Sequence, residues 1–226
     1  MAKKGKSMRK RRFTRKPRVP RSMTTAASAT FKGTTFPKRL CTTLKYVQQI
    51  GPSAAPNGLY AFSCNSLYDP DASFGGTQPL YFDQLMAIYN HYTVVGSKIT
   101  YRIVPKGTTA QEPYRIVSWI NDDTSVTPGD IDAISQQPTS KVRLCSGGIN
   151  PTQIVVSNKW SAKKYFPGST LANVYLKGNA SSGPSEQSYY YLNLRTMDGV
   201  STTNTWVVVE ISYVAVFTEL KDMAAS

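Results

Sequence analysis

The sequence predicts an all-β protein whose body is an eight-stranded antiparallel sandwich of two sheets, preceded by a basic N-terminal arm. Eight segments alternate apolar and polar residues with a period of two, which is typical of strands with one buried face. Only one long stretch has clear helical spacing instead. The start of the chain is rich in Lys and Arg and has almost nothing apolar to bury. We therefore expect residues 1–36 to be a disordered arm and linker, and residues 37–226 to be the folded domain.

The predicted strands are 40–50, 58–64, 94–104, 113–121, 141–145, 153–160, 187–195 and 205–220. In the first strand, Leu44 and Tyr46 share one face while Lys45 lies on the other. The third strand, VVGSKITYRIV, places Lys98, Thr100 and Arg102 on the polar side. Its apolar side is predicted to hold Val95, Ile99, Tyr101 and Ile103. The last strand has the longest apolar face, formed by Val207, Val209, Ile211, Tyr213, Ala215 and Phe217.

Two helices are predicted between the strands. In residues 79–92, PLYFDQLMAIYNHY, Pro79 suits a first helical turn. Apolar residues then recur at helical spacing, namely Tyr81, Leu85, Ile88 and Tyr92. A second, shorter helix is predicted over 128–135, PGDIDAIS. Long, irregular connections between some strands and tight ones between others favour a jelly roll, in which two Greek keys form two sheets. An immunoglobulin-like sandwich is the alternative, although it needs only about 100 residues.

Charge is distributed unevenly along the chain, whose formal net charge is +14. From Met1 to Tyr68 there are fifteen Lys and Arg and no acidic residue; from Asp69 onward there are twelve basic and thirteen acidic residues. The chain from Asp69 onward is therefore almost neutral in sum, with a net charge of −1, and the excess positive charge belongs to the first part of the chain. Such asymmetry points to a polyanionic partner.

The arm is the strongest candidate for a functional segment. It carries eleven basic residues within residues 3–21, namely Lys3, Lys4, Lys6, Arg9, Lys10, Arg11, Arg12, Arg15, Lys16, Arg18 and Arg21. A dense row of cations replaces the counterions of a nucleic-acid backbone, and arginine forks bridge phosphate oxygens. We therefore predict that the arm binds nucleic acid. The same composition is typical of a nuclear localisation signal, and the two roles are compatible.

The body offers weaker candidates. Lys159, Lys163 and Lys164 form a second basic cluster, which is either an ordinary solvated edge or an extension of the nucleic-acid surface. Tyr189, Tyr190 and Tyr191 stand in one predicted strand, so both sheet faces receive a tyrosine. The outward tyrosines are candidates for a subunit interface or for a platform on which bases stack.

Catalytic and metal-binding patterns are missing from the sequence. The one histidine, His91, is predicted at the end of a helix, and no nucleophile elbow, phosphate-binding loop or zinc motif appears. The Asp69/Asp71 and Asp122/Asp123 pairs sit beside turns, where Asp has local hydrogen-bonding roles, although hard oxygen ligands also suit a divalent cation. We expect no enzyme activity, no cofactor and no metal.

The cysteines and the hydropathy give two further expectations. Cys41, Cys64 and Cys145 are expected to be reduced, buried small residues, because they have neither paired spacing nor a zinc spacing. No apolar run approaches the length of a membrane span, so no membrane partner is expected.

The basic arm, the eight-strand body and the segment from Gly58 to Val104 together resemble the capsid proteins of circovirus-like viruses, which have circular single-stranded DNA genomes. QPLYFDQLMAIYNHYTVVGSKI carries most of the specific likeness. The resemblance implies a single jelly roll and a closed icosahedral shell, of about sixty copies in the simplest case. It also implies an arm directed inward, a packaged single-stranded DNA genome, import by the host nuclear machinery, and a location in the virion and in the host nucleus. The arm is shorter and less dominated by arginine than in animal circoviruses.

Two other functions stay open from the residues alone. A cellular nucleic-acid-binding protein, ribosomal or chromatin-like, also combines a basic arm with a β body, but it more often spreads basic residues over the body. A nuclease using the Asp pairs and a divalent metal is the third hypothesis.

Overall fold

The computed structural model of the protein describes residues 36–51, 57–106, 112–123, 131–147, 152–201 and 204–222. Apart from Phe36, the predicted arm lies outside the described residues, and its disorder stays a prediction.

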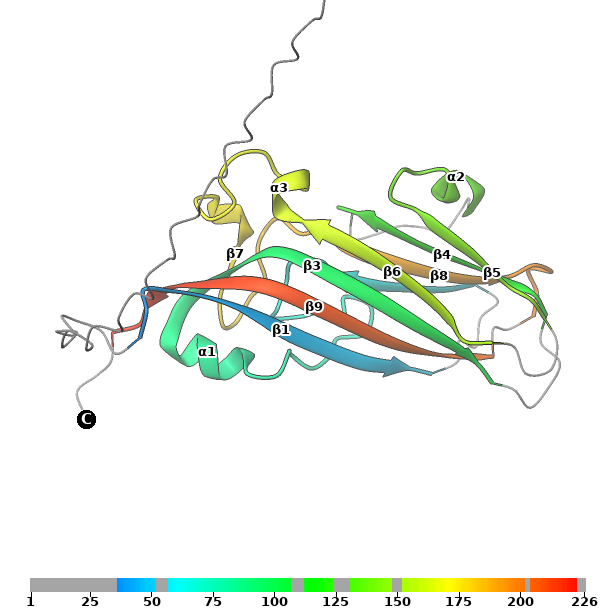
Figure 1. The fold of residues 1–226 in the computed structure, drawn as a ribbon, viewed down its shortest axis with the longest axis horizontal. Coiled ribbons are helices and arrows are strands. Elements are labelled where there is room, and N and C mark those ends of the chain that lie inside the picture. The colour runs from blue at the N-terminus through cyan, green and yellow to red at the C-terminus, as the bar shows by residue number, and fades with distance from the viewer. Residues whose placement is uncertain are drawn as a thin grey trace, which may run out of the picture. The chain divides into compact units, whose positions relative to one another are not determined.

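Two antiparallel sheets make up the body (Figure 1). Sheet A has the order β1 (Arg39–Ile50), β9 (Thr205–Leu220), β3 (Tyr89–Pro105) and β6 (Ile154–Ser161), and the two-residue β7 (Lys177–Gly178) pairs with β3 as well. Sheet B has the order β2 (Asn57–Ser63), β8 (Tyr189–Thr196), β4 (Tyr114–Asn121) and β5 (Lys141–Cys145). Eight of these strands match the predicted ones, and β7 is an addition that the sequence did not indicate.

The strand order identifies the fold. Along the chain β1, β3, β6 and β9 enter sheet A, while β2, β4, β5 and β8 enter sheet B, so most connections cross between the sheets. Eight strands wound in this way into two four-stranded layers define a jelly roll. The predicted fold class is confirmed, and the immunoglobulin-like alternative is wrong because its sheets have a different strand order.

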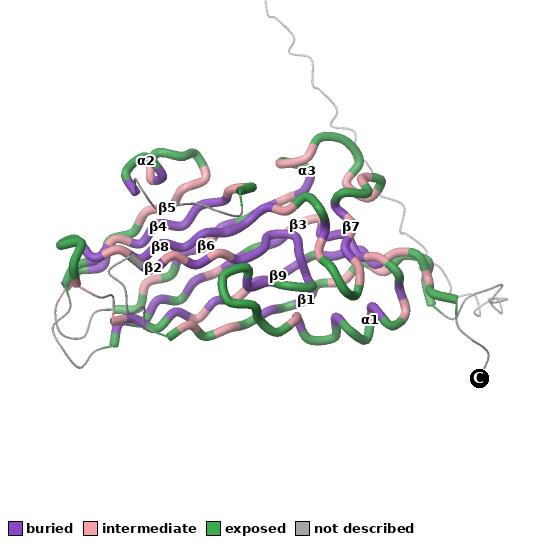
Figure 2. Tube along the Cα trace, turned by 180° about the vertical axis from the view of Figure 1, so that it is seen from behind, coloured by how far each residue is buried: buried purple, intermediate pink, exposed green. Residues whose placement is uncertain are grey.

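The core lies between the two sheets, where buried segments of both are seen in Figure 2. All six apolar residues predicted on the inner face of β9 are buried, and Val207, Val209 and Ile211 are fully inaccessible. From sheet B, Phe62, Leu192 and Leu194 belong to the same cluster. Each such side chain contributes about 1.5–3 kcal/mol on burial, which makes the alternating strand faces the main source of stability.

The first helix is shorter than predicted. Helix α1 spans Phe82–Ile88, and the predicted helical residues Tyr89 to Tyr92 are instead the start of β3. Tyr89 pairs with Leu220 and Tyr92 with Phe217 of β9, and both tyrosines are fully buried. Strand pairing and burial outweigh the helical spacing at these positions because tertiary context overrides local propensity.

The buried face of α1 also differs from the prediction. Phe82 and Met86 are buried, whereas Tyr81 is 63% exposed and precedes the helix with a φ of 71°. In β3, a β-bulge between Val94 and Gly96 shifts the register, so that Val94 is buried in place of the predicted Val95. An extra residue at a bulge turns the following side chains to the other face.

Three short helical segments complete the described residues. Helix α2 (Ile131–Ser135) falls within the helix predicted over 128–135. Residues 128–130 lie outside the described residues. Helix α3 (Ala162–Tyr165) and the 3-10 helix η1 (Val174–Leu176) lie in a stretch that the sequence indicated as irregular. Among the described residues, none of the helices has the length and apolar character needed to cross a membrane.

A second apolar cluster covers the outer face of sheet B. Ile131 and Ile134 of α2 pack there with Trp119, Tyr189 and Tyr191. The Trp119 and Tyr191 rings stack with centroids 5.1 Å apart. The outward tyrosines are therefore buried within the chain, and the prediction that they form a subunit interface or a base-stacking platform is wrong.

Candidate nucleic-acid interface

The eleven basic residues of the arm, Lys3 to Arg21, lie outside the described residues. Their role in nucleic-acid binding therefore stays a prediction from charge and spacing. The second basic cluster is described, and its three lysines are all exposed. Lys159 lies on β6 in sheet A, whereas Lys163 and Lys164 lie on α3, which continues from the end of that strand. The Lys164 ammonium is 5.5 Å from the centroid of the Tyr165 ring, a cation–π contact.

Strand pairing places Lys159 in a row of lysines that the sequence order does not reveal. Lys45 of β1 is opposite Ser212 of β9, Ser212 is opposite Lys98 of β3, and Lys98 is opposite Lys159 of β6. We call Lys45, Lys98 and Lys159 the lysine row. All three side chains are exposed on the outer face of sheet A. Because neighbouring strands lie about 4.8 Å apart, the row spans about 14 Å across the sheet.

The lysine row brings like charges together. Lys98 and Lys159 occupy directly opposed positions on adjacent strands, which is an arrangement that normally destabilises a sheet. No ion pair involves either ammonium among the residues that the structure describes. Arg102, four residues after Lys98, adds a fourth exposed cation to the same face.

Glu210 is the acidic residue within this group of cations. Its carboxylate lies 2.9 Å from the Lys45 ammonium. The hydrogen bond from Lys45, together with the charges of Arg102 and Lys98, lowers the pKa of Glu210 below its ordinary value. The lysine row and the next two outward rows of paired residues across β1, β9, β3 and β6, which contain Glu210 and Arg102, thus hold four cations and one acid. A body that is almost neutral in sum therefore has one strongly basic face, which favours a polyanion.

In the first aspartate pair, Asp71 has a structural role. Asp71 is fully buried, and one of its carboxylate oxygens accepts hydrogen bonds from the amides of Ser73 and Phe74. Its other oxygen accepts a 2.7 Å bond from the Gln48 side chain. Asp71 therefore holds the turn after β2, as the turn interpretation predicted. Burial and the charge of Asp71 raise the pKa of Asp69.

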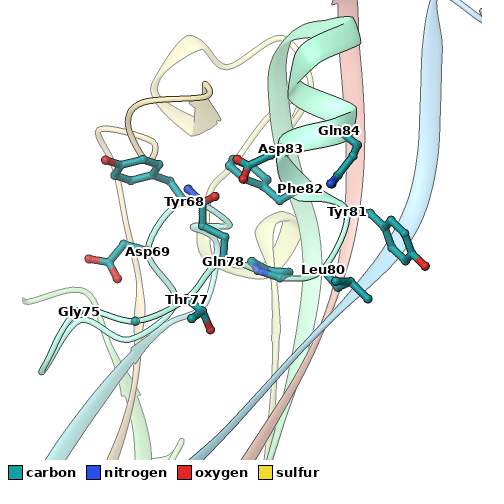
Figure 3. Close-up of a pocket in the computed structure, with 12 residues that line it drawn as sticks. Tyr68, Asp69, Gly75, Thr77, Gln78, Leu80, Tyr81, Phe82, Asp83 and Gln84 are labelled. Atoms are coloured by element: carbon teal, nitrogen blue, oxygen red, sulfur yellow. The ribbon is translucent and has the colours of Figure 1, made fainter.

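A pocket of about 550 Å³ lies beside this turn, lined by the loop from Tyr68 to Tyr81 and by the start of α1 (Figure 3). Asp69 and Asp83 line it together with Gln78 and Gln84. Nowhere in the described residues do three or more His, Cys, Asp or Glu side chains converge as a metal site. The pocket is an open surface hollow whose walls combine these polar side chains with Leu80 and Phe82.

His91 lies within β3, not at a helix end as predicted. Its Nε2 atom is 3.4 Å from one carboxylate oxygen of Glu219, and Lys177 lies 3.0 Å from the other. The three cysteines are free, as expected, but Cys41 is exposed while Cys64 and Cys145 are buried. Cys41 departs from the prediction because it points outward from the edge strand β1.

Solved protein structures resemble the fold of this chain, whereas comparisons of its sequence find no match. No family model matches the chain, and no curated protein matches it. The BFDV capsid protein, solved as a 60-mer, is 11% identical over 83% of this chain and 96% of that chain, with a TM-score of 0.43. Tobacco necrosis virus gives 14% identity over 81% and 97%, with a TM-score of 0.46. Mud crab tombus-like virus gives 12% identity over 98% and 96%, with a TM-score of 0.44. The fold class rests on the strand order itself.

Proposed function

We propose that this chain is a viral capsid protein that self-assembles into a closed icosahedral shell and packages nucleic acid through its basic arm. One observation carries the proposal: eleven cations precede a jelly-roll body whose residues from Asp69 onward have a net charge of −1. Because the body is nearly neutral, copies of it approach one another without strong repulsion. The arms repel each other until a polyanion neutralises them, so genome binding and shell closure are coupled.

Assembly requires surfaces that fit other copies of the same chain. Subunits that share one fold meet through heterologous contacts, which close under symmetry. Exposed apolar side chains on the loops suit such contacts. They include Phe74, Leu80 and Tyr81 before α1, and Val174 and Tyr175 in η1, each at least 57% exposed. The role of the protein is structural, with no catalytic step.

The finer assignments follow from the resemblance to circovirus-like capsid proteins. They are a single-stranded DNA genome, about sixty copies in the simplest shell, and entry into the host nucleus through the import machinery. The arm then acts twice, as a nuclear localisation signal on the free subunit and as the genome-binding segment in the virion. Single-stranded DNA and RNA present the same phosphate charge, so the arm alone favours neither.

The alternative is a cellular nucleic-acid-binding protein with a β body. Size-exclusion chromatography and negative-stain images of the purified full chain separate the two functions. Uniform particles support the capsid, whereas monomers or small oligomers support the cellular protein.

Removing the arm's charge tests its packaging role. A full-length variant with all eleven arm cations replaced by Gln keeps the body intact, and deletion of residues 1–30 provides a second variant. We expect both to fold, as judged by circular dichroism, and to enclose no nuclease-resistant DNA. The matched control replaces Lys106 and Lys221 by Gln and should package as the parent does. If either arm variant protects as much DNA as the parent, the role assigned to the arm is wrong.

A further inference from the structure

The outer face of sheet A combines cations with an exposed aromatic side chain. The lysine row and Arg102 lie on this face, and beyond Arg102 the next outward pair is Val104 opposite Trp206. Trp206 is 37% exposed, whereas the other two tryptophans of the chain, Trp119 and Trp160, are 0% and 3% exposed. In the part of the chain that the structure describes, no helix lies over this face (Figure 1), while α2 covers the outer face of sheet B.

Cations that follow a backbone and an aromatic ring that stacks on a base are the two parts of a platform for single-stranded nucleic acid. At the 3.4 Å rise of a stacked strand, the row of about 14 Å is long enough for about four phosphates. Beside Glu210, the side chains between the cations on β6 are small or apolar, namely Ser157 and Val155, so a strand can lie close to the sheet there.

The opposed pair of lysines gives an independent indication. Lys98 and Lys159 repel each other in the free protein, and Glu210 is bound to Lys45 and not to them. A bound phosphate group between the two ammonium groups removes this repulsion. A second protein copy would need a negatively charged surface to do the same.

We propose that the outer face of sheet A is a structured binding site for the packaged single strand, separate from the arm. Lys45, Lys98, Lys159 and Arg102 contact its phosphates, and Trp206 stacks on a base. This inference rests on the proposed packaging function and adds that the folded body itself, not the arm alone, holds the genome.

The test uses the full-length protein and a thymidine oligonucleotide as the probe. Binding is measured by anisotropy of the labelled oligonucleotide over a range of salt concentrations. Each phosphate contact to a single strand contributes about 0.7 to the slope of log affinity against log salt, so Lys98→Gln/Lys159→Gln should lower that slope by about 1.4. The matched control, Arg143→Gln/Lys221→Gln, makes the same change in charge away from the lysine row and Trp206 and should keep the parent slope.

Tryptophan fluorescence provides the second readout. Because Trp206 is the exposed tryptophan, quenching on oligonucleotide binding reports contact with this face. We expect quenching in the parent, its loss in Trp206→Phe, and its reduction in Lys98→Gln/Lys159→Gln. Thermal unfolding serves as the folding control, and the double lysine variant should unfold at or above the parent temperature because the like charges are gone.

The possible outcomes separate this inference from the function on which it rests. If the double lysine variant keeps the parent slope and quenching, the sheet face does not bind the strand, although arm-dependent packaging survives. If that variant binds as the parent does but no longer forms particles, the face is a contact between copies and the inference is overturned. If the parent binds no oligonucleotide at all, both the inference and the packaging function fail.

Discussion

The Tyr213 hydroxyl donates a 2.7 Å hydrogen bond to the backbone carbonyl oxygen of Ser63, which joins β9 of sheet A to β2 of sheet B through the core. Both residues are fully buried. A buried carbonyl without a partner is costly, so this bond fixes how the two sheets lie against each other.

Replacing Tyr213 by Phe tests this link between the sheets. The ring stays in the core, but the Ser63 carbonyl loses its donor, and we expect the free energy of unfolding to fall by about 1–3 kcal/mol. Urea unfolding of the unassembled protein measures the change. Tyr175→Phe is the control because Tyr175 is 57% exposed, and it should be neutral. Equal midpoints for Tyr213→Phe and the parent would show that the bond does not stabilise the fold.

Gly178 of β7 is a position where any side chain collides with the core. A Cβ atom built there would lie 2.3 Å from the Tyr92 ring, which is fully buried and cannot move aside. Gly178→Ala should therefore destabilise the protein by about 1–3 kcal/mol, the usual cost of overpacking. At Gly96, the nearest atom to an added Cβ is 3.5 Å away, so Gly96→Ala is the matched control. Comparable losses of stability in both variants would refute the steric account.

Tyr81 is expected to store backbone strain. It has a φ of 71°, a region that suits Asn or Gly, while its side chain is largely exposed. Tyr81→Asn should raise the free energy of unfolding by about 1 kcal/mol, since Asn adopts this conformation at lower cost. Tyr175→Asn removes a similarly exposed tyrosine without positive φ and should bring no gain. A decrease in stability for Tyr81→Asn would mean that its ring makes contacts worth more than the strain.

Glu219 makes stability depend on pH at the end of β9. The hydrogen bond from Lys177, with the charge of His91, lowers the pKa of Glu219 from its ordinary value of 4.5. Its stabilising contribution is therefore fully present above pH 4.5 and is lost as pH falls through the lowered pKa. Because the pair is half exposed, Glu219→Gln should cost less than about 1 kcal/mol at pH 7. Unfolding curves at pH 7 and pH 3 should show the difference between parent and variant shrinking at the lower pH; a constant difference contradicts this assignment.

The strands could be predicted from the sequence because each has one buried face. Strand β5 begins and ends where the alternation indicated, and the inner face of β9 is buried throughout. The length of the first helix was overestimated because Tyr92 fits both a helical spacing and a strand. The strand partners of Tyr92, Phe217 and Gly178, are distant in sequence. Local patterns do not contain such pairings.

The candidate site was predicted only in part, for the same reason. Lys159 was singled out as a neighbour of Lys163 and Lys164, but its spatial neighbours on the sheet are Lys98 and, across β9, Lys45. Each of these lysines stands at an outward position of its own strand, which the alternation does show. The missing information was the strand order and register, which decide whether outward lysines meet or lie apart.

The most direct test of the proposed function is to purify the full chain from cells that express it, treat it with nuclease, and examine it by electron microscopy and by extraction of its nucleic acid. We expect closed particles of uniform size that contain nuclease-resistant single-stranded DNA. Single subunits or small oligomers, with all nucleic acid digested, would contradict the proposal that this jelly roll encloses a genome.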